Sequence, residues 1–155
     1  MSNLKRILFA EDDPKDIELA LEALDDHHLA NEVVVVRNGA VALDYLFRRG
    51  SYSNRPAGNP AVVLLDLKMP KVDGMEVLRQ IKADERMKVI PVVMLTSSRE
   101  EQDLVKSYNL GVNAYVVKPI SFSQLVEAIK QLGLFWGVLN EPPVGSARHR
   151  EADAA

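Results

Sequence analysis

Five consecutive apolar residues, 61–65, lead directly into an aspartate, Asp66. A strand that is apolar at every position must be covered on both faces, as the strands of a parallel sheet are. Open α/β sheets place their ligands at the carboxyl ends of such strands. Asp66 is therefore either the cap of the turn that follows, which contains Pro70 and Gly74, or the centre of a site. The remainder of the chain has to distinguish these two interpretations.

Apolar segments that favour strands alternate five times with segments of helical periodicity. The expected strands cover residues 6–10, 32–36, 61–66, 89–96 and 113–117. The expected helices are marked by Ile17, Leu21, Leu24 and His28; by Val41, Tyr45 and Leu46; by Val77, Leu78 and Ile81; by Leu104, Val105 and Tyr108; and by Leu125, Ile129 and Leu132. This alternation predicts a flavodoxin-like, doubly wound α/β fold, (βα)5, whose parallel strands lie in the order 2-1-3-4-5. Residues 48–60 form an unusually long loop for so small a unit.

Charge and composition exclude several classes of partner. The chain has 155 residues, a formal net charge of -3 and no cysteine, so we expect one domain without disulfides or thiolate chemistry. A negative net charge argues against nucleic acid or an anionic membrane as the main partner. The first apolar run is too short for a signal peptide, and no segment approaches a membrane-spanning length. We therefore expect a cytoplasmic protein.

Acidic residues end two strands that the predicted sheet makes neighbours. Glu11, Asp12 and Asp13 follow the first strand, and Asp66 follows the third. Taken singly, Asp12 or Asp13 could cap the helix that begins at Pro14. Three carboxylates within about 5 Å would repel by about 3 kcal/mol per pair unless their pKa values rise or a cation joins them. Oxygen ligands of this kind suit Mg²⁺. The acids also argue against a flavin- or dinucleotide-binding protein, which would have a phosphate-binding loop after the first strand, where these carboxylates would repel the phosphate.

The fourth and fifth strands also end in polar residues. Thr96 follows the fourth strand, where it could simply cap a helix, and Lys118 follows the fifth. A lysine there is explained equally well by a salt bridge to the acids or by a counter-charge for a phosphoryl group. No serine–histidine pair suggests a nucleophile, and His27, His28 and His149 are not expected to be ligands.

These strand ends resemble the receiver domains of two-component response regulators. The resemblance rests on Glu11 with Asp12, on Asp66, on Thr96 and on Lys118 with Pro119, and it extends over residues 5–132. It implies a signalling domain, not an enzyme with an external substrate, which accepts a phosphoryl group from a histidine kinase. The alternatives are a degenerate receiver that only binds a partner and, less favoured, an α/β metal-dependent phosphatase.

The resemblance also assigns roles residue by residue. Asp66 corresponds to the phosphoacceptor, and Thr96 and Lys118 correspond to residues that contact the phosphoryl group. Glu11, Asp12, Asp66 and the backbone carbonyl of Lys68 correspond to the ligands of Mg²⁺ or Mn²⁺. Tyr115 corresponds to the aromatic residue whose rotamer changes with the active state. Asp13 lies outside the acidic pair, and we expect it to cap the first helix.

A narrower resemblance, to the small phytochrome-associated response regulators, rests on the long loop and on the sequence GLFWGVLNEPP near the C-terminus. It implies a phytochrome kinase as the phosphoryl donor. We expect the receiver domain to span residues 5–139 and residues 140–155 to be a disordered tail, with no second domain for output. Phe135, Trp136 and Leu139 then either pack back on the domain or form a homodimer interface, and we favour the homodimer.

Overall fold

The computed structural model describes residues 6–26 and 32–132, which form one parallel sheet flanked by helices. The strands are β1 (Arg6–Ala10), β2 (Glu32–Val36), β3 (Val62–Asp66), β4 (Val92–Thr96) and β5 (Ala114–Val117). They lie side by side in the order β2-β1-β3-β4-β5, and every pairing is parallel. The predicted fold class and strand order are therefore confirmed.

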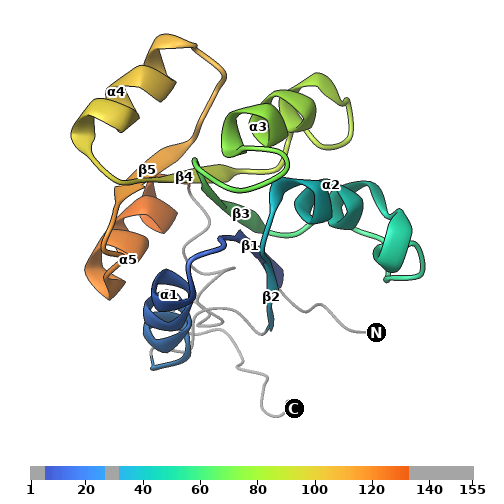
Figure 1. The fold of residues 1–155 in the computed structure, drawn as a ribbon, viewed down its shortest axis with the longest axis horizontal. Coiled ribbons are helices and arrows are strands. Elements are labelled where there is room, and N and C mark those ends of the chain that lie inside the picture. Colours follow the sequence, from blue (N-terminus) through green and yellow to red (C-terminus); the bar gives the residue numbers. More distant parts are fainter. Residues whose placement is uncertain (1–5, 27–31, 133–155) are drawn as a thin grey trace, which may run out of the picture.

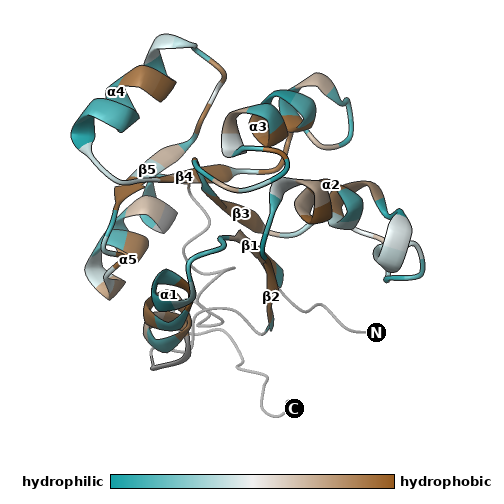
Figure 2. Ribbon diagram, in the orientation of Figure 1, coloured by the Kyte–Doolittle hydropathy of each residue, from teal (hydrophilic) through white to brown (hydrophobic). Residues whose placement is uncertain are grey.

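Helices cover both faces of the sheet (Figure 1). Helices α1 (Pro14–Asp26) and α5 (Phe122–Gln131) lie on one face, and α2 (Gly39–Phe47), α3 (Gly74–Ala83) and α4 (Arg99–Ser107) lie on the other. Successive strand residues point to opposite faces, so Phe9 packs toward α1 and α5 while Leu8 packs toward α2 and α3. The interiors of the central strands are accordingly apolar, with polar residues only at their ends, and most other polar residues lie on the helices (Figure 2).

Several element boundaries differ from the expected ones. Strand β4 begins at Val92 and not at residue 89, since Val89 is 70% exposed and Pro91 has no N–H to donate to the ladder. Strand β5 begins at Ala114, and Asn113 just before it bonds to Val92 twice: its backbone N–H donates to the Val92 carbonyl, and its side-chain oxygen accepts the Val92 N–H. Helix α4 buries only Val105 of its three expected apolar markers; Leu104 and Tyr108 are exposed.

The long loop at residues 48–60 is organised around the guanidinium of Arg55. This group donates to the carbonyl oxygen of Tyr45 at 2.6 Å and to that of Pro56 at 2.7 Å, and it lies 4.2 Å from the centroid of the Tyr45 ring. A short 3-10 helix, η1 (Gly50–Tyr52), lies within the loop. Arg55 thus adds a second donor to the Tyr45 carbonyl in the last turn of α2, which also accepts the N–H of Arg48. The loop leads to the amino end of β3, the end of the strand opposite Asp66.

Some predictions concern residues outside the described part of the chain. The apolar residues Phe135, Trp136 and Leu139, the tail at 140–155, and His27 and His28 all lie there. The homodimer and the outer bounds of the domain consequently stay predictions. Within residues 6–26 and 32–132, no helix combines the length and apolar character that a membrane crossing requires.

Candidate functional site

Buried polar side chains gather at a single edge of the sheet. In the described part of the chain only Glu11, Asp66 and Thr96 are polar or charged and buried, and they are 0%, 5% and 0% exposed. Asp66 ends β3 and Thr96 ends β4, while Glu11 follows β1 directly. Burying polar or charged groups without partners costs free energy, so their concentration at one edge of the sheet indicates a functional site.

Three carboxyl groups converge at this edge, as the sequence predicted. One carboxylate oxygen from each of Glu11, Asp12 and Asp66 lies within 4.8 Å of the others. Asp12 is exposed, whereas the other two are buried. Burial raises the pKa of Glu11 to about 7, and the nearby charge of Asp66 adds to the effect of burial. Burial also raises the pKa of Asp66 above its ordinary value.

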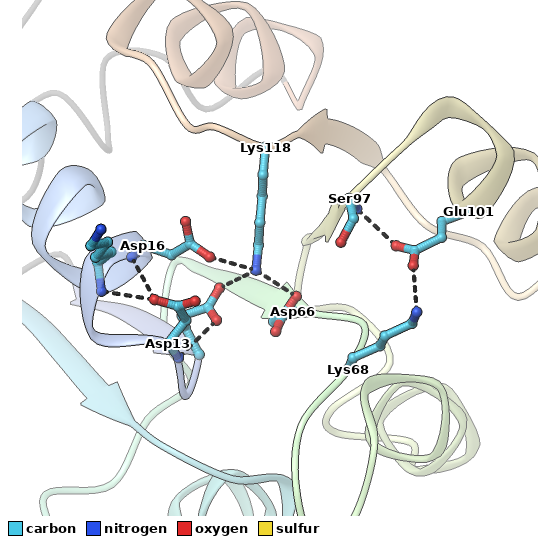
Figure 3. A network of polar contacts seen from close by, with 9 residues as sticks. Asp13, Asp16, Asp66, Lys68, Ser97, Glu101 and Lys118 are labelled. Atoms are coloured by element: carbon cyan, nitrogen blue, oxygen red, sulfur yellow. Dashed lines mark hydrogen bonds and ion pairs between the residues drawn. The ribbon is translucent and has the colours of Figure 1, made fainter.

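The ammonium of Lys118 contacts two of these acids, Glu11 and Asp66 (Figure 3). Its Nζ is 2.8 Å from Glu11 Oε1 and 3.0 Å from Asp66 Oδ1. Asp16 on α1 adds a third partner, with its Oδ2 3.0 Å from the same Nζ. Burial alone would lower the pKa of Lys118, but the hydrogen bonds to Glu11 and Asp66 outweigh burial and raise it. The salt bridge considered for Lys118 is therefore present, and it holds the ammonium beside the carboxylate of Asp66.

Thr96 supplies a buried hydroxyl whose hydrogen-bonding capacity is unused. Its Oγ1 is fully buried and has no hydrogen-bond partner among the described residues. Strand pairing sets Asp66 opposite Leu95, so Thr96 ends the neighbouring strand one residue further along. Buried polar atoms nearly always have a partner. The orphaned hydroxyl therefore fits a site that receives another polar group.

Asp13 takes the capping role expected of it. Its Oδ1 accepts the N–H of Lys15 at 2.8 Å, at the start of α1. The N–H of Asp13 in turn donates to Glu11 Oε2 at 3.1 Å. The cap thereby holds one oxygen of Glu11 while Lys118 holds the other.

Two close backbone contacts hold the segment that follows Asp66. The N–H of Gly74 donates to the carbonyl of Leu67 at 2.8 Å, and a Cβ on Gly74 would lie 2.2 Å from the Asp66 carbonyl oxygen. A Cβ on Gly39, the first residue of α2, would lie 1.8 Å from the carbonyl oxygen of Val72. Only glycine permits such approaches, and they fix the backbone that carries Lys68, the residue expected to offer its carbonyl to a metal.

Tyr115 occupies the position expected of it, within β5. Its side chain is partly buried and packs against the core on the α2–α3–α4 face. Lys106 of α4 places its Nζ 5.4 Å from the centroid of the tyrosine ring. The ring thus links β5 to α4.

Two acids at the site were missed in the sequence, although the sequence contains a pattern for each. Asp16 lies in the first turn of α1, where helical geometry turns it back toward the residues that precede the helix. Glu101 lies three residues after Ser98, the spacing of a capping box, and its Oε2 pairs with Lys68 Nζ at 2.9 Å.

The donor set suits a hard divalent cation. Carboxylate oxygens that converge within one ion's reach and remain open to solvent at Asp12 match the preference of Mg²⁺ and Mn²⁺ for oxygen. Such an ion would take over the carboxylates that Lys118 now engages.

Comparisons with known proteins identify the class. The response regulator receiver domain matches residues 7–130. The response regulator Rcp1 of Synechocystis sp. is 39% identical over 132 residues, which cover 85% of this chain and 88% of Rcp1. A solved structure of the Mn²⁺-bound form of Rcp1 covers 94% of this chain and 99% of its own, at 36% identity and a TM-score of 0.70. The chain belongs to the response regulator receiver family.

Within that family, the similar structures point to phytochrome-associated members. The bacteriophytochrome response regulator AtBRR is 64% identical, with a TM-score of 0.85, and the match covers 90% of this chain and 100% of AtBRR. The phosphorylated cyanobacterial phytochrome response regulator RcpA is 45% identical, with a TM-score of 0.69, over 85% of this chain and 93% of RcpA. The chain is thus a receiver whose near relatives are phytochrome response regulators, and neither alternative function is favoured.

Proposed function

We propose that this chain accepts a phosphoryl group on Asp66 from the phosphohistidine of a histidine kinase and thereby switches the binding of a partner. One observation carries the assignment to Asp66. Its buried carboxylate lies between the Lys118 ammonium at 3.0 Å and the strand that ends in Thr96, whose hydroxyl has no partner among the described residues. Phosphorylated RcpA and the related phytochrome regulators favour a kinase of the phytochrome class as the donor.

In the proposed transfer, an oxygen of Asp66 forms a bond to phosphorus as the bond between phosphorus and the imidazole nitrogen breaks. The imidazole leaves with that electron pair, and the product is an acyl phosphate. Both reactants are anionic, so the protein must offset their repulsion. Lys118 can exchange its Asp66 contact for a phosphoryl oxygen, and the Thr96 hydroxyl can donate to another.

Glu11, Asp12, Asp66 and the backbone carbonyl of Lys68 are the residues proposed to hold Mg²⁺ or Mn²⁺. When bound, such an ion neutralises negative charge on the carboxylates and on the phosphoryl group. Tyr115 is proposed to respond to the position of Thr96, because Tyr115 pairs with Met94 on the same neighbouring strand. The chain is proposed to act in the cytoplasm as a signalling domain.

Intact mass after incubation with acetyl phosphate and Mg²⁺ tests the proposal. The wild type should gain the mass of one phosphoryl group, and the gain should require the metal. Asp66→Asn should gain none, whereas Asp103→Asn, which removes an exposed aspartate on α4, should behave as wild type. Full phosphorylation of Asp66→Asn would refute the assignment. Steady turnover of an external phosphate ester would favour the phosphatase instead.

A homodimer through Phe135, Trp136 and Leu139 is a separate proposal that rests on the sequence. Two adjacent aromatic residues between Gly133 and Gly137 cannot both face one core from a regular helix. Sedimentation of the wild type and of the Phe135→Ala/Trp136→Ala double variant tests it. A wild type that stays monomeric at high micromolar concentration, phosphorylated or not, refutes it.

A further inference from the structure

A second lysine stands beside Asp66, on the side away from Lys118 (Figure 3). Lys68 follows Asp66 by two residues, and its Nζ pairs with Glu101 Oε2 at 2.9 Å. The lysine side chain is 76% exposed, whereas that of Glu101 is only 16% exposed. The pair therefore connects the loop after β3 to the first turn of α4, beside the strand end that carries Asp66.

The other oxygen of Glu101 holds a backbone donor at the same edge. Glu101 Oε1 accepts the N–H of Ser97 at 2.7 Å, and Ser97 directly follows Thr96. This bond, together with Lys68, keeps the pKa of Glu101 below its ordinary value, so the carboxylate is ionised at neutral pH. Glu101 thus engages one ammonium and one amide that face the same edge of the sheet as Asp66.

Helix capping accounts for only part of this arrangement. Ser98 Oγ accepts the N–H of Glu101 at 3.2 Å, which is the usual first half of a capping box. The second half would run from the glutamate to the N–H of Ser98, but Glu101 bonds to Ser97 instead. Capping also does not explain why the exposed side chain of Lys68, which belongs to another loop, pairs with the Glu101 carboxylate.

We propose that Glu101 is a positioning residue that withholds Lys68 and the Ser97 N–H from Asp66 until a phosphoryl group is present. The inference rests on the function proposed above and adds a means of regulating it. A phosphoryl group carries more negative charge than a carboxylate and offers three acceptor oxygens, so it competes with Glu101 for both donors. Transfer of Lys68 to the phosphoryl group would break the only ion pair that joins the β3–α3 loop to α4 among the described residues.

This competition has a thermodynamic consequence that can be measured. Any contact present only in the unphosphorylated state opposes phosphorylation by its own free energy. Removal of Glu101 should therefore strengthen binding of a phosphoryl mimic, and the gain should depend on Lys68. An exposed ion pair of this kind corresponds to an increase in affinity of about two- to five-fold.

The experiment is a double-mutant cycle on the affinity for beryllium fluoride in the presence of Mg²⁺, measured by calorimetry on the full chain. Glu101→Gln should bind the mimic about two- to five-fold more tightly than wild type. The same substitution in a Lys68→Met background should change the affinity little. Glu100→Gln is the matched control, because it removes an equal charge one residue earlier in the same helix turn. It should have little effect in either background.

The outcomes separate this inference from the proposed function. Weaker binding by Glu101→Gln, or an equal effect with and without Lys68, would overturn the inference and leave Glu101 as a helix cap. An effect of Glu100→Gln as large as that of Glu101→Gln would overturn it as well. If the wild type becomes phosphorylated normally in either case, the proposed function stands. A wild type that neither gains phosphoryl mass nor binds the mimic would refute the proposed function, and this inference with it.

Discussion

The Lys118 ammonium lies 3.0 Å from the carboxylate of Asp16, an acid on α1 that stands apart from the convergent Glu11, Asp12 and Asp66. Lys118 therefore has a partner that a metal ion bound by the other three would not remove. It can leave Asp66 and Glu11 without leaving the site. Several measurable consequences follow from this arrangement and from the buried groups around it.

Asp16→Asn should slow phosphorylation by acetyl phosphate while retaining Mg²⁺ binding. Asp16 would keep Lys118 near the site when a metal ion binds Glu11 and Asp66, and without Asp16 a less localised cation would stabilise the transferring group less. We expect a loss of about three- to ten-fold, smaller than the loss in Lys118→Ala, from the time course of intact mass. Glu18→Gln, on an exposed face of α1, is the control. Equal slowing by both variants would mean a general charge effect.

Lys118→Ala should bind Mg²⁺ more tightly than wild type, because the ammonium now occupies two of the carboxylates that the metal needs. The same change should lower the free energy of unfolding in EDTA by about 3 kcal/mol, as it leaves buried charges without their partner. Calorimetric titration with Mg²⁺ and urea unfolding at pH of about 8 measure the two effects. Lys68→Ala, an exposed lysine, is the stability control. Abolished metal binding in Lys118→Ala would contradict this account.

Thr96→Val should weaken binding of beryllium fluoride without lowering the stability of the fold. The variant removes a buried hydroxyl that has no partner among the described residues, so the free energy of unfolding should stay equal or rise by about 1 kcal/mol. Affinity for beryllium fluoride should fall about ten-fold or more, because a hydrogen bond to a charged acceptor is lost. Thr96→Ser, which keeps the hydroxyl, should preserve most of the affinity. Equal affinities for the valine variant and the wild type would show that the hydroxyl does not contact the mimic.

The metal-free protein should lose stability as the pH rises from about 5 to about 7. Glu11 keeps its proton to a pKa of about 7 in the folded chain, whereas its ordinary value is 4.5. Between these values the folded state binds more protons than the unfolded state, so the free energy of unfolding falls with pH. The Glu11 contribution is up to about 3 kcal/mol.

Urea unfolding in EDTA across this range measures the effect, with Glu11→Gln as the comparison. The raised pKa of Asp66 acts with the same sign, so the variant should show a shallower decline but not a flat profile. A decline of equal slope in both proteins would assign the pH dependence to other groups.

The sheet and the residues at the ends of its strands could be predicted from the sequence, because they depend on apolar runs that recur along the chain. Apolar runs such as β3 require cover on both faces, and parallel strands bring Asp66 and Thr96 to one edge. Pairings between loops and helices are different, because they depend on how far a side chain reaches in three dimensions. No periodicity indicates that Arg55 will cap α2, or that Lys68 will turn to Glu101 and away from Asp66.

The close approach of Gly74 to the Asp66 carbonyl makes one side of the site more rigid than the other. On the side toward α2 and α3, backbone meets backbone with no room for a single methyl group, so this wall cannot yield without unpacking the helices. On the side toward α4, the wall is held by ion pairs and side-chain hydrogen bonds, which can change partners. When the charge at Asp66 changes, the tightly packed backbone on the α2–α3 side therefore cannot move, whereas the ion pairs and hydrogen bonds on the α4 side can rearrange. Movement caused by phosphorylation should accordingly travel one way, toward α4 and β5.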